Sequence, residues 1–255
     1  MESVLGAREA SLQEAQILGV RVHRVRMAEA LERIERLIHR REPSLVITAD
    51  ANAILLALED MEFRALFERA SLITADGAGL LWAGRRLGQP FPERVSGVDL
   101  VAQLTRLSRQ KGYRLYFLGA APSVAERAAQ NLLAKYPNAQ IVGVQHGYFQ
   151  PTDEPAIVAQ IAAARPDVLL IGMGMPRQEK WAWAHRDALG VPVMIGVGGS
   201  FDVYAGVVRR APRWMQRTGC EWLWRLIQDP RKIRKVRNLP RFAWQVWRAA
   251  RPPLG

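Results

Sequence analysis

Six short apolar runs, separated by longer segments of helical periodicity, constrain the fold of this chain more than any other feature. The runs cover residues 45–48, 72–74, 114–118, 140–144, 168–171 and 193–197. Segments before and between them, such as 27–40, 97–109 and 123–135, repeat apolar residues every three or four positions, as amphipathic helices do. Strands that alternate with helices usually pair in parallel, with helices on both faces of the sheet. We therefore predict an α/β fold with a mainly parallel sheet.

Charge divides the 255-residue chain into two regions. Residues 209–255 contain 13 Lys and Arg against two acids, whereas residues 1–208 contain 23 bases and 22 acids. Five of the eight tryptophans also lie in the basic region, whose apolar residues recur at helical spacing. We predict an α/β domain over 1–210 and a helical appendage over 211–255. Such an appendage seeks a membrane surface, a nucleic acid or a phosphorylated ligand.

The sequence also bears on where the protein resides. It has one cysteine, which is typical of a reducing compartment. Residues 1–16 contain acids and no long apolar run, unlike a signal peptide, and no segment approaches the ~18 apolar residues of a membrane span. We expect a cytoplasmic protein.

Polar residues and glycines follow the predicted strands. In parallel sheets ligands bind beyond the carboxyl ends of the strands, and glycines there let backbone N–H groups approach a phosphate. The clusters are at Gly119, at Gly172 and Gly174, and at Gly196–Gly199. A tight turn explains any one cluster as well as phosphate binding does, but three at one edge favour a nucleotide-like ligand. Neither G-x-G-x-x-G nor a P-loop sequence is present.

Asp76 is the strongest candidate for a catalytic group. It follows the strand at 72–74 and precedes a glycine, where a carboxylate can enter a cleft and accept a proton from an attacking hydroxyl. The alternative is an N-cap for the helix expected over 79–87, and spacing alone favours that cap. The same alternative applies to Asp50, and Gln178 could equally cap the helix that starts near Pro176.

Metal ligands are poorly represented. The four histidines form no H-x-x-x-H pair, and there is no D-x-D sequence, so we predict neither a metal nor a cofactor. A bound diphosphate would then need protein cations, for which guanidinium groups are well suited. Candidates are Arg94, Arg177, Arg209, Arg210 and the appendage bases, although any single arginine is more simply a solvated surface charge.

The order of these motifs resembles the WecG/TagA/CpsF family of bacterial glycosyltransferases over residues 44–235. The strings that carry the resemblance are Thr48-Ala-Asp-Ala, Asp76-Gly, Glu93-Arg-Val-Ser-Gly, Leu118-Gly, Gly147-Tyr-Phe, Gly174-Met-Pro-Arg-Gln-Glu-Lys-Trp, Gly196-Val-Gly-Gly-Ser-Phe-Asp, Ala205-Gly-Val-Val-Arg-Arg-Ala-Pro and Glu221-Trp-Leu-Trp-Arg-Leu. No single glycine motif would suffice, but several uncommon strings recur in the right order.

The resemblance implies a Rossmann-like body and a metal-independent transfer. A sugar such as N-acetylmannosamine would move from a UDP-sugar donor to an undecaprenyl-diphosphate-linked acceptor, for teichoic acid or another surface polysaccharide. Asp76 would be the general base, and an inverting reaction is our hypothesis. The other implied roles are acceptor positioning by Thr48, contacts to the reacting groups by Arg94 and Gln178, uracil stacking by Tyr148 and a nucleotide contact by Asp202.

The resemblance also implies roles for the appendage. It would bring Arg225, Lys232 and Lys235 to the diphosphate and would touch the inner face of the membrane, consistent with its charge and tryptophans. Three positions depart from the family pattern: many relatives have Asn at the position of Asp50 and Arg at those of Lys232 and Lys235. A lysine keeps the charge but loses the bidentate guanidinium.

Three alternatives compete with a glycosyltransferase. A nucleic-acid-binding protein would explain the basic aromatic appendage but would leave Asp76 without a role, so we expect no nucleic-acid partner. An NAD-dependent oxidoreductase lacks its expected glycine fingerprint. A structural membrane adaptor would bind liposomes regardless of Asp76.

Apolar stripes of the appendage also lead us to expect self-association in solution.

Overall fold

The computed structural model describes residues 12–212, 214–215, 221–228 and 237–250. Within these residues a parallel sheet of six strands runs in the order β4-β3-β8-β7-β5-β6. The strands are β3 (Ser44–Ala49), β4 (Leu72–Ala75), β5 (Arg114–Gly119), β6 (Gln140–Gln145), β7 (Val168–Gly172) and β8 (Val193–Gly196). The predicted parallel sheet is therefore confirmed, with each apolar run forming one strand.

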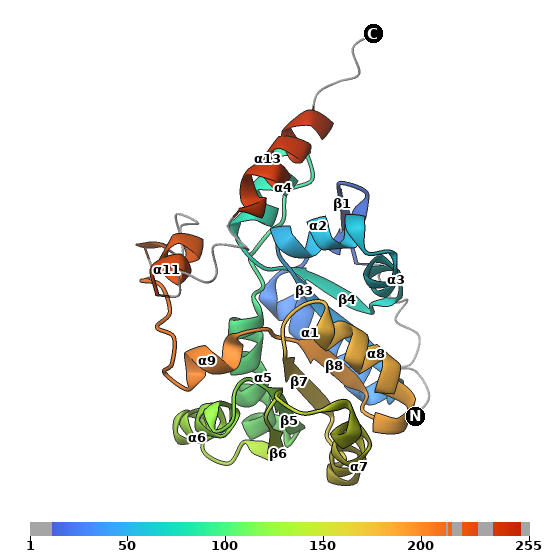
Figure 1. Cartoon of the computed structure of the whole chain (residues 1–255), viewed down its shortest axis with the longest axis vertical. Coiled ribbons are helices and arrows are strands. Elements are labelled where there is room, and N and C mark those ends of the chain that lie inside the picture. Colours follow the sequence, from blue (N-terminus) through green and yellow to red (C-terminus); the bar gives the residue numbers. More distant parts are fainter. Residues whose placement is uncertain (1–11, 213, 216–220, 229–236, 251–255) are drawn as a thin grey trace, which may run out of the picture.

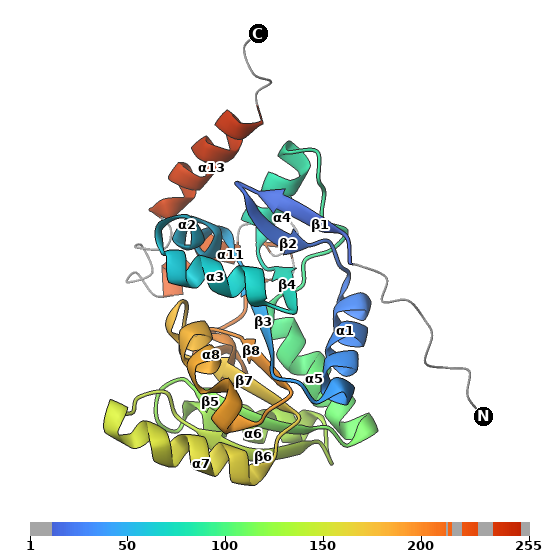
Figure 2. The same cartoon turned by 90° about the vertical axis from the view of Figure 1, so that its right-hand side faces the viewer.

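Helices cover both faces of this sheet (Figures 1 and 2). One face packs against α1 (Met27–Arg40), α5 (Gly97–Lys111), α6 (Val124–Lys135) and α9 (Ser200–Tyr204). The other packs against α2 (Ala51–Glu59), α3 (Met61–Arg69), α4 (Ala78–Arg86), α7 (Glu154–Ala164) and α8 (Arg177–Leu189), with a 3-10 turn at Pro151–Asp153. Because alternate strand residues point to opposite faces, this gives two apolar layers and a Rossmann-like α/β fold.

The order of the strands creates a crevice at one edge of the sheet. β5 and β7 are hydrogen-bonded neighbours, yet the helix after β5 lies on one face and the helix after β7 lies on the other. The same divergence separates α2 after β3 from α9 after β8. Loops that leave adjacent strands in opposite directions open a ligand crevice at the carboxyl ends.

An antiparallel hairpin, which we did not predict, precedes the sheet. It consists of β1 (Glu14–Ile17) and β2 (Val20–His23), joined by Leu18 and Gly19 with φ of 53° and 77°. Two positive φ values in a two-residue loop are typical of a type I′ turn. The Nδ1 of buried His23 accepts a hydrogen bond from the backbone N–H of Ile73, at 2.9 Å, so the hairpin is fixed to β4.

The described part of the appendage is helical, as predicted. It contains α11 (Glu221–Gln228) and α13 (Asn238–Ala249), and α13 packs against α2 and α4 (Figure 2). Phe242 and Val246 are buried there, whereas Trp244 and Trp247 are exposed. The end of the appendage thus shares the core of the body, and the division at residue 210 stays a prediction. Among the described helices, none has the length and apolarity to cross a membrane.

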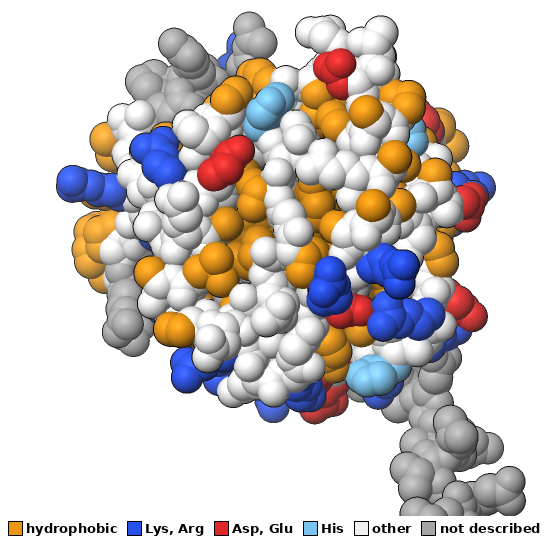
Figure 3. All heavy atoms as spheres, turned by 90° about the horizontal axis from the view of Figure 1, so that it is seen from below, with side chains coloured by type: hydrophobic (Ala, Val, Ile, Leu, Met, Phe, Trp, Pro, Cys, Tyr) orange, Lys and Arg blue, Asp and Glu red, His pale blue; other side chains and the backbone are white. Residues whose placement is uncertain are grey.

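Mixed charge on the body contrasts with the basic appendage. The end of the molecule viewed in Figure 3 carries Lys and Arg side chains next to Asp and Glu, with hydrophobic atoms between them. Pairs at the amino ends of the strands include Arg41 with Asp167, at 2.9 Å. The body therefore offers no uniformly basic surface in this view, consistent with its nearly neutral composition.

Candidate active site

A cavity of about 730 Å³ lies at the carboxyl ends of the strands. The loops after all six parallel strands contribute to its wall, which explains why polar and glycine residues recur at those positions of the sequence. Its lining includes Asp50 after β3, Asp76 after β4, Ala120 after β5, Tyr148 after β6, Gly174 after β7 and Gly198 after β8. Leu239 of the appendage also lines it.

Asp76 lies in this wall and accepts a hydrogen bond that the sequence did not suggest. Gly77, not Asp76, occupies the N-cap position of α4. The Asp76 Oδ2 instead accepts from the backbone N–H of Gly97, the first residue of α5, at 3.1 Å. The partial positive charge at a helix N-terminus stabilises a carboxylate there. The capping interpretation that spacing favoured thus gives way to a carboxylate presented to the cavity.

Asp50 lies next to Asp76 because β3 and β4 pair with Ala49 opposite Ala75. One oxygen of Asp50 accepts from the Ala53 N–H at 2.9 Å, which makes Asp50 the N-cap of α2. The predicted cap is confirmed, and the side chain also lines the cavity. This side of the cavity therefore carries two adjacent acidic residues.

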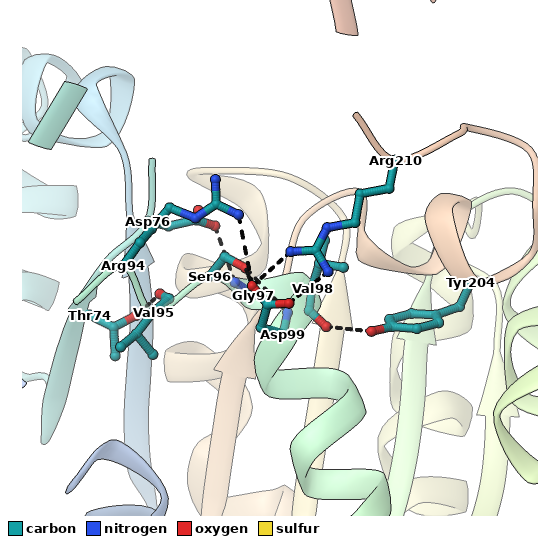
Figure 4. A network of polar contacts seen from close by, with 10 residues as sticks. All are labelled: Thr74, Asp76, Arg94, Val95, Ser96, Gly97, Val98, Asp99, Tyr204 and Arg210. Carbon is teal, nitrogen blue, oxygen red and sulfur yellow. Dashed lines mark hydrogen bonds and ion pairs between the residues drawn. The ribbon is translucent and has the colours of Figure 1, made fainter. Parts of the chain in front are cut away.

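Two arginines converge on one carboxylate beside Asp76 (Figure 4). Arg94 lines the cavity, and its Nη2 lies 3.8 Å from Asp99 Oδ2. Arg210, which follows α9, places its two terminal nitrogens 2.7 and 2.8 Å from the two Asp99 oxygens. Ser96 Oγ donates to Asp99 at 2.6 Å and caps α5. Burial favours the neutral form of Asp99, but these partners outweigh it and hold its pKa below the ordinary value.

The opposite side of the cavity is built from glycine-rich loops that touch one another. A side chain at Gly119 would come within 2.5 Å of the Gly172 backbone, and one at Gly172 would come within 2.8 Å of the Gly198 carbonyl. α8 begins at Arg177 in the same wall, and its N-terminal N–H groups give that end of the helix a partial positive charge. Close-packed backbone and a helix N-terminus are suited to an anion such as a diphosphate.

Gln178 holds two of these loops in place. Its Oε1 accepts from the N–H groups of Gly174 and Gly198, at 3.0 and 3.2 Å, and its Nε2 donates to Glu179 at 2.7 Å. The side chain is only 1% exposed and lies behind the cavity wall. Thr48 is likewise buried, and its Oγ1 donates to the Gly196 carbonyl at 2.8 Å. Both residues stand behind the lining rather than in it.

The other predicted residues divide between the wall and the undescribed region. Tyr148, 73% exposed, lies in the cavity wall, as do Asp202 in the first turn of α9 and Arg177. The Arg177 guanidinium stands 5.2 Å from the centre of the Phe149 ring, a cation–π distance. Arg225 lies in α11. Lys232 and Lys235 fall outside the described residues.

Sequence reasoning missed Asp99 and the pairing role of Arg210. The Ser96-x-x-Asp99 spacing is a helix-start signature and could have located the start of α5. The contact between Asp99 and Arg210 spans 111 residues, and no local pattern signals such a pair. The arrangement joins a carboxylate, cavity-lining cations and glycine-rich loops, groups that suit transfer of a phosphate-linked substituent to a hydroxyl.

Comparison with known proteins agrees with this chemistry. Residues 15–254 match the model of the glycosyl transferase WecG/TagA/CpsF family. Two proteins from Staphylococcus aureus strains MW2 and NCTC 8325 / PS 47, each named N-acetylglucosaminyldiphosphoundecaprenol N-acetyl-beta-D-mannosaminyltransferase, are 32% identical over 237 residues, 92% of this chain and of each relative. The protein is therefore a glycosyltransferase and belongs to the WecG/TagA/CpsF family.

Proposed function

We propose that this enzyme transfers N-acetylmannosamine or a close relative from its UDP-sugar to an undecaprenyl-diphosphate-linked GlcNAc-type acceptor. The product would enter cell-wall or surface polysaccharide synthesis. The relatives' name supports the acceptor and the transferred sugar. The observation that carries the proposal is the Asp76 carboxylate, held at the N-terminus of α5 on one side of a cavity whose other side is glycine-rich backbone.

The proposed reaction is a single displacement. The acceptor hydroxyl oxygen attacks the anomeric carbon while Asp76 takes the hydroxyl proton. The bond between the anomeric carbon and the diphosphate oxygen breaks, and UDP leaves with the electron pair. The configuration of that carbon is inverted. Arg94 and Arg177 line the cavity, and their charges would offset the charge that develops on the leaving diphosphate.

The remaining roles follow from the position of each side chain. Tyr148 at the cavity mouth would stack on the uracil, and Asp202 would accept hydrogen bonds from the nucleoside. Asp50 would bind an acceptor or donor hydroxyl. Gly174 would approach the diphosphate, and Gln178 and Thr48 would position the loops that make this approach. Arg225, Lys232 and Lys235 would reach the diphosphate from the appendage.

The appendage would hold the enzyme on the inner face of the cell membrane. The exposed Trp244 and Trp247 of α13 suit the bilayer interface, and the basic residues of 211–255 suit an anionic leaflet. Contacts of this kind give reversible attachment rather than insertion. In solution, the same exposed apolar residues would favour self-association.

The test is acceptor-dependent UDP release from a panel of UDP-sugars, with a short-chain lipid-diphosphate-GlcNAc acceptor and Asp76→Asn as the comparison. We expect release from one donor class only, and a product whose anomeric configuration, measured by NMR, is opposite to that of the donor. Retention of configuration would contradict the single displacement. No release from any donor by a folded, full-length enzyme would contradict the proposed substrate.

A further inference from the structure

Asp99 lies between Arg94, which lines the cavity, and Arg210, which directly precedes the appendage. It makes the shortest charged contacts of the network in Figure 4, both with Arg210. Two parallel N–H donors on two carboxylate oxygens fix both distance and orientation. Asp99 itself is fixed because Ser96 donates to its carboxylate and accepts from its backbone N–H, at 2.6 and 3.2 Å.

Arg209, the residue before Arg210, is hydrogen-bonded to α11. The backbone carbonyl of Arg209 accepts from Trp224 Nε1 at 3.0 Å and from Gln228 Nε2 at 2.8 Å. The Arg209 N–H donates to Gln228 Oε1 at 2.7 Å. These three bonds attach α11, the helix that contains Arg225, to the backbone of one residue, and that residue can hold α11 in place only if it is itself fixed.

The same turn of α5 also supports Asp76. Gly97, one residue after Ser96, donates its N–H to Asp76, and Val98 accepts from the Tyr204 hydroxyl at 2.8 Å. Residues 96–99 thus contact the predicted base, the end of α9 and the segment that leads to α11. Asp76 and the segment before α11 are therefore connected through the first turn of α5.

We propose that Asp99 is a positioning residue that anchors α11 to the start of α5 through Arg210. Without the Asp99–Arg210 contact, the backbone at Arg209 loses its fixed orientation, and α11, with Arg225, separates from the start of α5. The link from this anchor to catalysis rests on the proposed function, in which Arg225 approaches the donor diphosphate. The anchor itself is a property of the chain that can be measured without substrate.

The test is hydrogen–deuterium exchange of the full chain, comparing Asp99→Asn, Arg210→Gln, the double variant and wild type. Arg41→Gln is the matched control because it removes a similar contact with Asp167, at the other end of the sheet. We expect exchange of the amides at 225–228 to rise about tenfold in each single variant, as loss of a charged hydrogen bond predicts, and no further in the double variant. Exchange in α8 and in the control should stay as in wild type.

Arg210→Lys, which keeps the charge, tests whether the two-point contact between the guanidinium and Asp99 is needed. We expect it to restore part of the protection of α11, since one bond to Asp99 survives. Unchanged exchange at 225–228 in both single variants would overturn the anchor, as would a double variant whose effect is the sum of the two. If exchange rises in every helix of a variant, that variant has lost its fold. The exchange of α11 in Arg210→Lys then decides whether the anchor exists.

Measurements of activity distinguish failure of the anchor from failure of the proposed function. If wild type releases UDP, kcat/KM should fall in Asp99→Asn and in Arg210→Gln, by the same factor as in the double variant. If wild type releases no UDP but α11 loosens in the variants, the anchor stands and the proposed function fails. If wild type is active and α11 is unchanged, the anchor fails and the proposed function stands.

Discussion

The two sides of the cavity are built by different means. Charged side chains after β3 and β4, and in the segment that precedes α5, form one side, where Asp50, Asp76 and Arg94 line the cavity. Backbone forms most of the other, where the loops after β5, β7 and β8 pack so closely that a methyl group at Gly172 would not fit. The first side can exchange a proton with a ligand, whereas the second can mainly bind one.

The proposed function assigns proton transfer to the first side and nucleotide binding to the second. A carboxylate that must accept a proton needs a defined partner, which the Gly97 N–H supplies at 3.1 Å. The N–H groups of Gly174 and Gly198 both donate to Gln178, which fixes the loops that the proposed function assigns to the diphosphate. Changes on the charged side should therefore affect turnover, and changes on the glycine side should affect nucleotide affinity.

The largest expected effect is that of Asp76→Asn on turnover. We expect kcat to fall by about 10²–10⁴, the usual contribution of a general base. Asn keeps an oxygen that can accept from Gly97, so the loop should remain in place. Stopped-flow or steady-state UDP release measures the change, with Asp60→Asn as the control, because Asp60 caps α3 outside the cavity lining. An active Asp76→Asn enzyme would remove the functional distinction between the two sides.

Gly172→Ala should have the next largest effect, and on the glycine side. The added Cβ would lie 2.8 Å from the Gly198 carbonyl and from the Phe201 ring, so the loops must separate. Overpacking of this kind costs about 1–3 kcal/mol of unfolding free energy. Urea unfolding and UDP titration would measure both losses. A variant with native stability and native UDP affinity would show that the close contact is not needed.

The stability of the protein should depend on pH through His23 of the hairpin, which is hydrogen-bonded to β4. Burial, with the charge of Arg21, lowers the pKa of His23 to about 4, so the folded protein keeps it neutral while the unfolded chain takes up a proton below about 6.5. Stability should be complete above pH 6.5 and fall as the pH drops toward 4, by roughly 2 kcal/mol at pH 5.

His23→Asn isolates the contribution of His23 to the pH dependence of stability, because the Asn amide oxygen can accept from the Ile73 N–H without titrating. Chemical unfolding from pH 7 to pH 4.5 should show a shallower loss of stability in the variant than in wild type. Identical slopes in the two proteins would contradict the assignment to His23.

The smallest effect on turnover is expected for Gln178→Met, which keeps volume but removes the hydrogen bonds. Two backbone N–H groups lose their acceptor, which costs about 1–3 kcal/mol. UDP affinity should fall about tenfold while kcat at saturating UDP-sugar changes little. A loss of kcat with unchanged affinity would move Gln178 to the chemical step.

Much of the fold was visible in the sequence because it depends on local patterns. Apolar runs and helical periodicity located the six parallel strands and α1, α5 and α6, and the carboxyl-end rule placed Asp76 and Gly174 in one cavity. The hairpin escaped because four-residue strands give little periodicity, although Gly19 could have suggested the turn.

The side-chain partners were less predictable, for a physical reason. Asp76 resembled a cap because spacing cannot tell whether a carboxylate turns to its own helix or to the start of another, 21 residues away. The burial of Gln178 and the pairing of Asp99 with Arg210 depend on how the loops after different strands meet. Such contacts follow from the packing of the whole sheet rather than from any segment.

UDP binding by Asp76→Asn tests the separation of the two sides most directly. Isothermal titration of UDP into the variant and wild type gives the affinity of the glycine side, independent of turnover. We predict a dissociation constant within about twofold of wild type in an enzyme that has lost turnover, since the removed interaction belongs to the transition state. A loss of UDP affinity as large as the loss of kcat would contradict the account, because Asp76 would then bind the nucleotide.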